Sequence, residues 1–158
     1  MSRFSEYMVS HDIDWFCRIN GYLCHFASNG SEIPDFIADS WLIRRTQGVV
    51  AELPILFEER ELRIDEGHRR ELQELDGFNE QRYYESFKIF ASKGFYSFDY
   101  EWNKEGGEYR LIVGPGSRII HPDSEFLIEQ LPRVSVERLY ERDRLMFERI
   151  LSQIRRIE

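Results

Sequence analysis

Cysteine is scarce in this sequence, in which Cys17 and Cys24 are the two cysteines among 158 residues. A disulfide framework needs a larger set of cysteines, and a structural zinc site needs further cysteine or histidine ligands at short, regular spacing. Neither pattern is present. The sequence therefore argues against a disulfide-stapled domain and a zinc-stabilised one, and its motifs indicate no cofactor.

Long apolar runs are also missing. No stretch approaches the roughly 18 apolar residues that a membrane-spanning helix needs, because charged residues, glycine or proline interrupt each candidate within a few positions. The N-terminal segment MSRFSEYMVSHDID contains neither an apolar block nor the small-residue cleavage site of a secretory signal. We therefore expect a cytoplasmic protein that has no membrane partner.

Positive charge is in deficit. The chain has 21 lysines and arginines against 29 aspartates and glutamates, which gives a formal net charge of -8. Duplex nucleic acid binds to basic surfaces, so this balance argues against a duplex nucleic-acid partner. Apolar residues make up 42% of the chain, which is enough for a packed core. With no linker or low-complexity segment, residues 1–158 are expected to form a single globular domain.

The dipeptide Asn20-Gly21 predicts the first structural element, because it tolerates the positive φ angles of a two-residue type I′ turn. Residues typical of strands flank it, so a β-hairpin is expected over about 13–28. Alternation gives one nearly apolar face, which we expect in the core: Ile13, Trp15, Cys17, Ile19, Tyr22, Cys24, Phe26 and Ser28. The other face is mixed, and alternation alone leaves open whether a helix covers it or water reaches it: Asp14, Phe16, Arg18, Leu23, His25 and Ala27.

The two cysteines are predicted to lie directly opposite each other on the core face of this hairpin. The Cα atoms of a hydrogen-bonded antiparallel pair are about 5.5 Å apart, which is within the range that a disulfide permits. A cytosolic setting and burial both favour free thiols, which then behave as small apolar side chains. The sequence thus favours two thiols over a redox-controlled disulfide.

A second hairpin is predicted over about 95–113. Its first strand shows the clearest alternation in the chain. The aromatic face carries Tyr96, Phe98, Tyr100 and Trp102, and the polar face carries Ser97, Asp99 and Glu101. A loop over 103–107 is expected to precede the return strand that contains Tyr109, Leu111 and Val113.

Helical periodicity and capping signals predict four helices, over 40–53, 79–93, 124–131 and 136–157. Residues 55–76 fit either an extended strand or a loop that leads into a helix, so they are not assigned. The expected fold class is α+β: an antiparallel sheet built from two β-hairpins, with helices packed on one face and a long C-terminal helix. Asp143 interrupts the apolar stripe of that helix, which argues against a coiled coil and leaves the oligomeric state open.

Two histidine-containing groups are candidates for catalysis. His25 lies in mid-strand on the mixed face, but Ser28 projects from the opposite face and no acidic residue is evident to orient the imidazole. His11, Asp12 and Asp14 place metal-binding groups close together, yet further ligands at matching positions are absent. The sequence therefore assigns no catalytic residue and no metal site.

The function expected first is a non-enzymatic protein-protein interaction or accessory module, because the chain is aromatic-rich and lacks a catalytic constellation. The residues expected to bind the partner lie on the mixed face of the first hairpin and at the tip of the second: Asp14, Phe16, Arg18, His25, Trp102 and Asn103. The alternative is a small hydrolase or transferase that uses His25 or the His11/Asp12/Asp14 cluster. A second alternative is a small-ligand-binding domain that uses the aromatic strand 96–102 and a cavity beside it.

Overall fold

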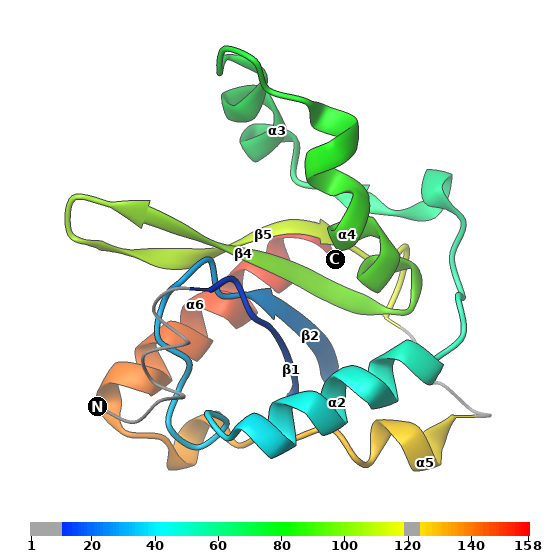
Figure 1. The fold of residues 1–158 in the computed structure, drawn as a ribbon, viewed down its shortest axis with the longest axis vertical. Helices are drawn as coiled ribbons and strands as arrows, with labels where there is room; N and C mark the ends of the chain where they lie inside the picture. Colours follow the sequence, from blue (N-terminus) through cyan, green and yellow to red (C-terminus); the bar gives the residue numbers. More distant parts are fainter. Residues whose placement is uncertain (1–10, 119–123) are drawn as a thin grey trace.

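Six strands form one sheet in the computed structural model, which describes residues 11–118 and 124–158 (Figure 1). The strands are β1 (Asp14–Ile19), β2 (Tyr22–Ala27), β3 (Arg63–Ile64), β4 (Phe95–Asn103), β5 (Gly106–Gly114) and β6 (Arg133–Val134). Their order across the sheet is β3-β5-β4-β2-β1-β6. Residues 1–10, on which most of the expectation about a secretory signal rests, lie outside the described part of the chain.

In the two described ranges, five α-helices and two 3-10 turns accompany the sheet. They are α2 (Ser40–Glu52), η1 (Glu59–Glu61), α3 (Glu66–Gln73), α4 (Glu80–Ser92), α5 (Glu125–Ile128), η2 (Val136–Arg138) and α6 (Glu141–Ile157). The helix expected over 136–157 is therefore divided, because Leu139 and Tyr140 have extended backbone between η2 and α6. Within the two described ranges, every helix is too short or too polar to cross a membrane.

The sheet is mixed, so the expectation of an antiparallel sheet is wrong in two places. β2 pairs parallel to β4, and β1 pairs parallel to β6. Parallel neighbours require a long crossover, and the chain between β2 and β4 contains α2, α3 and α4. Turn and alternation signals are local, so they indicate each antiparallel hairpin but not the way in which the hairpins join.

Within the hairpins the pairing is antiparallel. β1 and β2 pair in the predicted register, with Cys17 opposite Cys24. Their turn residues Asn20 and Gly21 have φ angles of 49° and 79°, as a type I′ turn requires. β4 and β5 pair to the ends of both strands, so their connection is shorter than the loop expected over 103–107.

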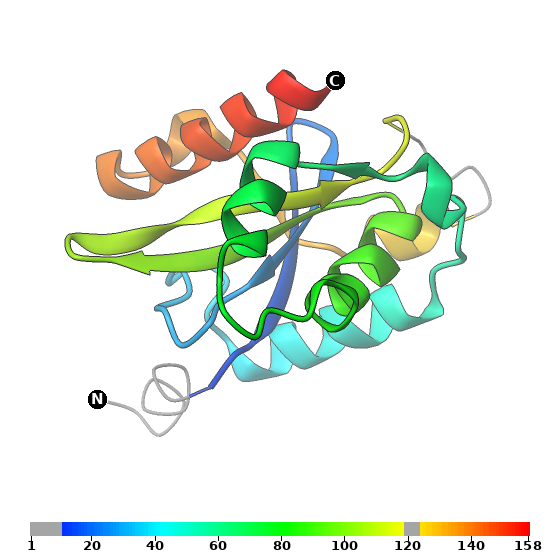
Figure 2. The ribbon, with the colours of Figure 1, turned by 90° about the horizontal axis from the view of Figure 1, so that it is seen from above.

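Helices cover both faces of the sheet, whereas the sequence places them on one. Figure 2 shows the sheet between α6 on one side and α2 and α4 on the other. Phe16, Leu23 and Phe95 pack with apolar residues of α2 on one face, while Phe26 and Phe98 pack with residues of α6 on the other. A sheet that is apolar on both faces is stable only when both faces are covered.

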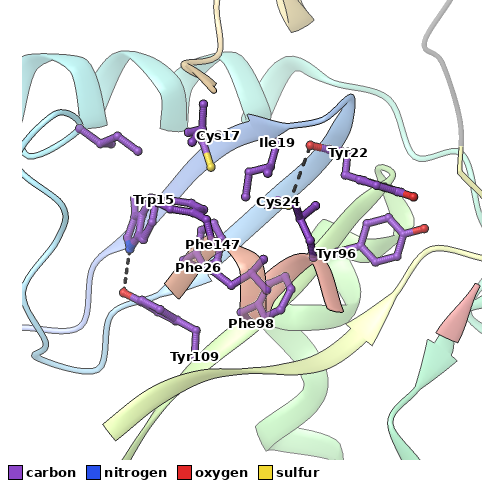
Figure 3. Close-up of a cluster of buried hydrophobic side chains, with 14 of the residues drawn as sticks. Trp15, Cys17, Ile19, Tyr22, Cys24, Phe26, Tyr96, Phe98, Tyr109 and Phe147 are labelled. Atoms are coloured by element: carbon purple, nitrogen blue, oxygen red, sulfur yellow. Dashed lines mark hydrogen bonds between the residues drawn. The ribbon is translucent and has the colours of Figure 1, made fainter. Parts of the chain in front are cut away.

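Aromatic rings form the core beneath α6 (Figure 3). Trp15 stacks on Phe26 with ring centroids 4.1 Å apart, and its Nε1 donates a hydrogen bond to the Tyr109 hydroxyl at 3.0 Å. Burial of one such ring stabilises a fold by about 2 to 3 kcal/mol, so the hydrophobic effect holds α6 on the strands. Cys17 and Cys24 lie in this core as buried free thiols, and burial raises the pKa of both.

Candidate binding site

Helices cover the mixed face of the first hairpin, which alternation leaves open, so the binding residues expected there do not form an exposed patch. Phe16 and His25 are buried beneath α2 and α4, and Arg18 is partly buried. The Asp14 side chain is 45% exposed at the edge of this region. The crossover from β2 to β4 carries helices over the face, and strand alternation assigns residues to a face without saying what covers it.

His25 lies between a carboxylate and a hydroxyl. Its Nε2 donates to Oδ1 of Asp14 at 2.7 Å, and its Nδ1 lies 3.0 Å from Oγ of Ser97. Ser97 in turn donates to the backbone carbonyl of Phe87 in α4 at 3.3 Å. Sequence reasoning misses Ser97 as a partner, because only the parallel pairing of β2 with β4 places it opposite His25.

Asp14, His25 and Ser97 have the functional groups of a nucleophilic hydrolase in the setting of a protein core. His25 and Ser97 are both 0% exposed, and the ring centroid of Phe90 lies 4.1 Å from that of His25. A nucleophile has to reach the substrate, which this burial prevents. Buried polar groups normally have hydrogen-bond partners, so the arrangement favours a structural role for the three residues.

A second polar cluster attaches α3 to the sheet. Nε2 of His68 lies 2.5 Å from Oε1 of Glu101, and Arg110 pairs with Glu71 at 2.6 Å. The hydrogen bond with His68 lowers the pKa of Glu101. These charged contacts connect α3 to β4 and β5, in contrast to the apolar contacts that hold α6.

Asp99 lies between the two polar clusters on the same face of β4. Its Oδ2 accepts a hydrogen bond from the hydroxyl of Tyr83 in α4 at 2.8 Å. Burial raises the pKa of Asp99 to about 6, although the hydrogen bond acts in the opposite direction. The folded protein therefore holds a proton on Asp99 at pH values where an exposed aspartate is ionised.

The His11/Asp12/Asp14 cluster does not have the geometry of a metal site. Among the described residues, no three His, Cys, Asp or Glu side chains come together as metal ligands. Asp12 instead accepts a hydrogen bond from the backbone N–H of Asn29 at 2.8 Å, and Asp14 accepts from His25. Both carboxylates thus serve local hydrogen bonds at the start of the sheet.

A cleft of about 1150 Å³ lies on the α6 side of the sheet. It is lined by residues from the end of the β4-β5 hairpin, the loop that follows β2 and the start of α6. Four aromatic residues line it: Tyr100, Trp102, Tyr109 and Tyr140. Trp102 is 57% exposed and Tyr140 is 90% exposed, so large aromatic surfaces at this cleft face solvent.

Glycine lets the β4-β5 hairpin bring its rings together. Gly107 lies opposite Trp102 in the ladder and has a φ angle of 144°. A Cβ atom here would lie 2.6 Å from Cε1 of Tyr100 and 2.3 Å from the carbonyl oxygen of Glu101, so a larger residue displaces the ring. The Tyr100 ring packs instead against Trp102, with centroids 5.0 Å apart.

The loop that follows β2 is tied to the same hairpin through Asn29. Nε1 of Trp102 donates to the Asn29 carbonyl at 2.8 Å, and Nδ2 of Asn29 donates to the Tyr100 carbonyl at 3.0 Å. Asn29 has a φ angle of 47°, in the left-handed region that asparagine tolerates well. These bonds fix one wall of the cleft against the other.

Two of the predicted binding residues lie at the second hairpin, and they have different roles. Trp102 lines the cleft, whereas Oδ1 of Asn103 accepts a hydrogen bond from the backbone N–H of Glu105 at 2.8 Å and so shapes the turn. The aromatic strand 96–102 contributes Tyr100 as well, as the ligand-binding alternative requires. Sequence reasoning misses Tyr140, because its position in an apolar helical stripe predicts a core residue rather than an exposed one.

Comparisons with protein-family models, curated proteins and solved structures find no match for this chain. Its function therefore has to be inferred from the geometry of the cleft and of the polar clusters.

Proposed function

We propose that the chain is a non-enzymatic protein-binding module whose contact surface is the cleft beside α6. The observation that carries this proposal is the pair of exposed rings that line the cleft, Trp102 and Tyr140. Tyrosine and tryptophan are enriched at the energetic centres of protein interfaces, because they bury a large area and lose little conformational freedom. Solvent-facing rings beside a concave surface are thus well suited to contact with a partner.

A partner protein suits the cleft better than a small ligand does. Small-molecule pockets usually have volumes of about 300–1,000 Å³ and bury most of the ligand. This cleft measures about 1150 Å³ and has a ring that is 90% exposed at its edge, so a small ligand would keep much of its surface in water. A segment of a partner protein can cover both Trp102 and Tyr140.

The hydrolase or transferase alternative receives less support from the geometry. The described residues that line the cleft include no histidine, cysteine or serine, so a serine or cysteine nucleophile activated by a histidine is not found among them. His25 has hydrogen-bond partners of the required kind, but it is buried with them. The histidine-serine pair and the accessible cleft therefore lie in different parts of the molecule.

Site-specific photocrosslinking tests the proposal. A benzophenone-bearing residue replaces Leu145, which lines the cleft and is 48% exposed. The matched control carries the same group at Leu75, which lies between α3 and α4 and is 58% exposed. In lysate of the native cell, we expect one protein to crosslink from position 145 alone, and we expect Trp102→Ala to abolish that crosslink.

Besides the absence of a crosslink from position 145, three outcomes would contradict the proposal. Equal crosslinking from both positions indicates contact without a specific surface, and a crosslink that survives Trp102→Ala indicates that the rings do not bind the partner. A small molecule that co-purifies with the protein and is lost with Trp102→Ala supports the ligand-binding alternative instead.

A further inference from the structure

Negative charge is in excess around the cleft. Among the described residues, its lining contains four carboxylates, from Glu32, Asp35, Glu108 and Asp143, and two guanidinium groups, from Arg142 and Arg149. Each arginine faces one glutamate, at 4.0 Å for Arg142 and 3.9 Å for Arg149. Such long contacts between exposed side chains are weak, and water and salt screen them easily.

The two aspartates of the lining differ from the glutamates. Asp35 and Asp143 form no ion pair with any residue in the part of the chain that the structure describes. Asp143 is partly buried in the first turn of α6, where the helix dipole favours a negative charge. Two carboxylates for which the described residues supply no ion-pair partner therefore line the same cleft as the aromatic rings.

We propose that the cleft receives a positively charged side chain, lysine or arginine, from the partner; this inference rests on the protein-binding function proposed above. The planes of Tyr100 and Trp102 meet at 68°, so the two rings form a corner in the cleft that the carboxylates also line. The face of an aromatic ring carries negative potential and attracts a cation. Rings and carboxylates thus favour the same ligand charge.

The net charge of the whole chain also favours a basic partner. A formal net charge of -8 attracts a basic partner from a distance and repels an acidic one. An acidic segment in the cleft would lie among four carboxylates, and a neutral segment would cover Asp35 and Asp143 without supplying an opposite charge. A basic segment is the occupant that satisfies these groups.

Three synthetic peptides of equal length test the inference. Each alternates glycine with one other residue, which is lysine, serine or glutamate, and fluorescence anisotropy measures its binding to the full chain at two salt concentrations. We expect the lysine peptide to bind most tightly and to lose affinity as salt increases. Asp35→Asn combined with Asp143→Asn is expected to weaken this binding about tenfold, because each charge that solvent reaches contributes modestly.

A matched double variant controls for the loss of net charge. Glu74→Gln combined with Asp76→Asn removes the same charge from exposed positions between α3 and α4, away from the cleft. Its affinity for the lysine peptide is expected to equal that of the unmodified chain. Equal binding of the three peptides, or equal weakening by both double variants, overturns the inference.

The peptide and crosslinking experiments fail in distinguishable ways. If position 145 crosslinks a partner through Trp102 but no peptide is preferred, the protein-binding function stands and the charge inference is overturned. If the lysine peptide binds with the expected dependence on the two aspartates but no partner crosslinks, the charge preference stands and the protein-binding function is contradicted.

Discussion

The face of the sheet beneath α2 and α4 carries most of the potentially reactive side chains, whereas the face beneath α6 carries aromatic rings and two thiols. On the first face, His25 and Ser97 are enclosed and Asp99 and Glu101 are paired with helix residues. On the second, the rings continue beyond the core into the cleft. His25 and Ser97, which suggest catalysis, are thus enclosed in the protein. Part of the aromatic face, which suggests core packing, instead reaches the surface.

Desolvation explains the difference between the two faces. A polar group that is buried without a partner is costly, and Ser97, Asp99 and Glu101 of β4 are each paired with a group from a neighbouring element. The aromatic face has few such groups, of which the Trp15 indole N–H and the Tyr109 hydroxyl pair with each other, and it otherwise needs only contact with apolar surface. Figure 1 shows the end of the β4-β5 hairpin projecting beyond the other strands, where such contact is incomplete.

His25→Ala is expected to have the largest effect on stability. The substitution leaves a cavity and removes a hydrogen-bond partner from Asp14 and from Ser97, which together cost about 3 kcal/mol of unfolding free energy. Equilibrium unfolding in urea measures the loss, and Trp41→Ala, on an exposed part of α2, serves as a control with an expected loss below about 1 kcal/mol. If both variants lost the same unfolding free energy, His25 would contribute no more to stability than an exposed residue does.

Asp99→Asn is expected to stabilise the protein at neutral pH by about 1 to 2 kcal/mol, because burial of the ionised carboxyl is unfavourable and asparagine can still accept from Tyr83. The pKa of Asp99 is about 6 in the folded state, against an ordinary value of 3.8. Between these values the folded chain binds more protons at this site than the unfolded chain, so the contribution of Asp99 to stability falls as pH rises.

Urea unfolding at several pH values measures this difference between variant and unmodified protein. The extra unfolding free energy of the variant should be near zero at pH values below the ordinary pKa of 3.8. It should reach its full value above about pH 6. A constant advantage across that range would mean that Asp99 does not ionise within it.

Glu101→Gln tests whether charged contacts hold α3. Loss of the charged partner of His68 and Arg110 is expected to cost about 1 kcal/mol and to act locally. Amide hydrogen exchange should accelerate in α3 while the amides of α6 keep their protection. Equal acceleration in both helices would show that α3 and α6 unfold as one unit.

Trp102→Ala is expected to have the smallest effect on stability and the largest on binding. Its ring is 57% exposed, so we expect a loss below about 1 kcal/mol in urea unfolding together with loss of the partner crosslink. This combination would separate the binding region of the aromatic face from its core. A large loss of stability would instead mean that the ring is part of the core.

Local signals in the sequence predict several elements well. The Asn20-Gly21 turn predicts the register of β1 with β2, and alternation from Tyr96 to Trp102 predicts β4. The helix expected over 40–53 is observed as α2, with Asp39 as its N-cap, and the one expected over 79–93 is observed as α4. The segment 55–76, which has no single periodicity, contains η1, β3 and α3 in short succession.

The candidate site is predicted only in part. Trp102 is found from alternation, and Tyr100 belongs to the same aromatic strand. Tyr140 and the acidic residues of the cleft come from distant parts of the chain, and no local pattern relates them to Trp102. The sequence assigns Ser97 and His25 each to a strand face. Their contact, however, depends on the parallel pairing of β2 with β4.

The sequence by itself determines which residues share a face, because side chains alternate along a strand and recur along a helix with fixed periods. It also determines the first turn, since Asn20 and Gly21 accept positive φ angles at little cost. Only the tertiary structure decides which face is closed and which stays open. That outcome depends on where the crossover helices and α6 pack, and packing is set by contacts between residues far apart in the chain.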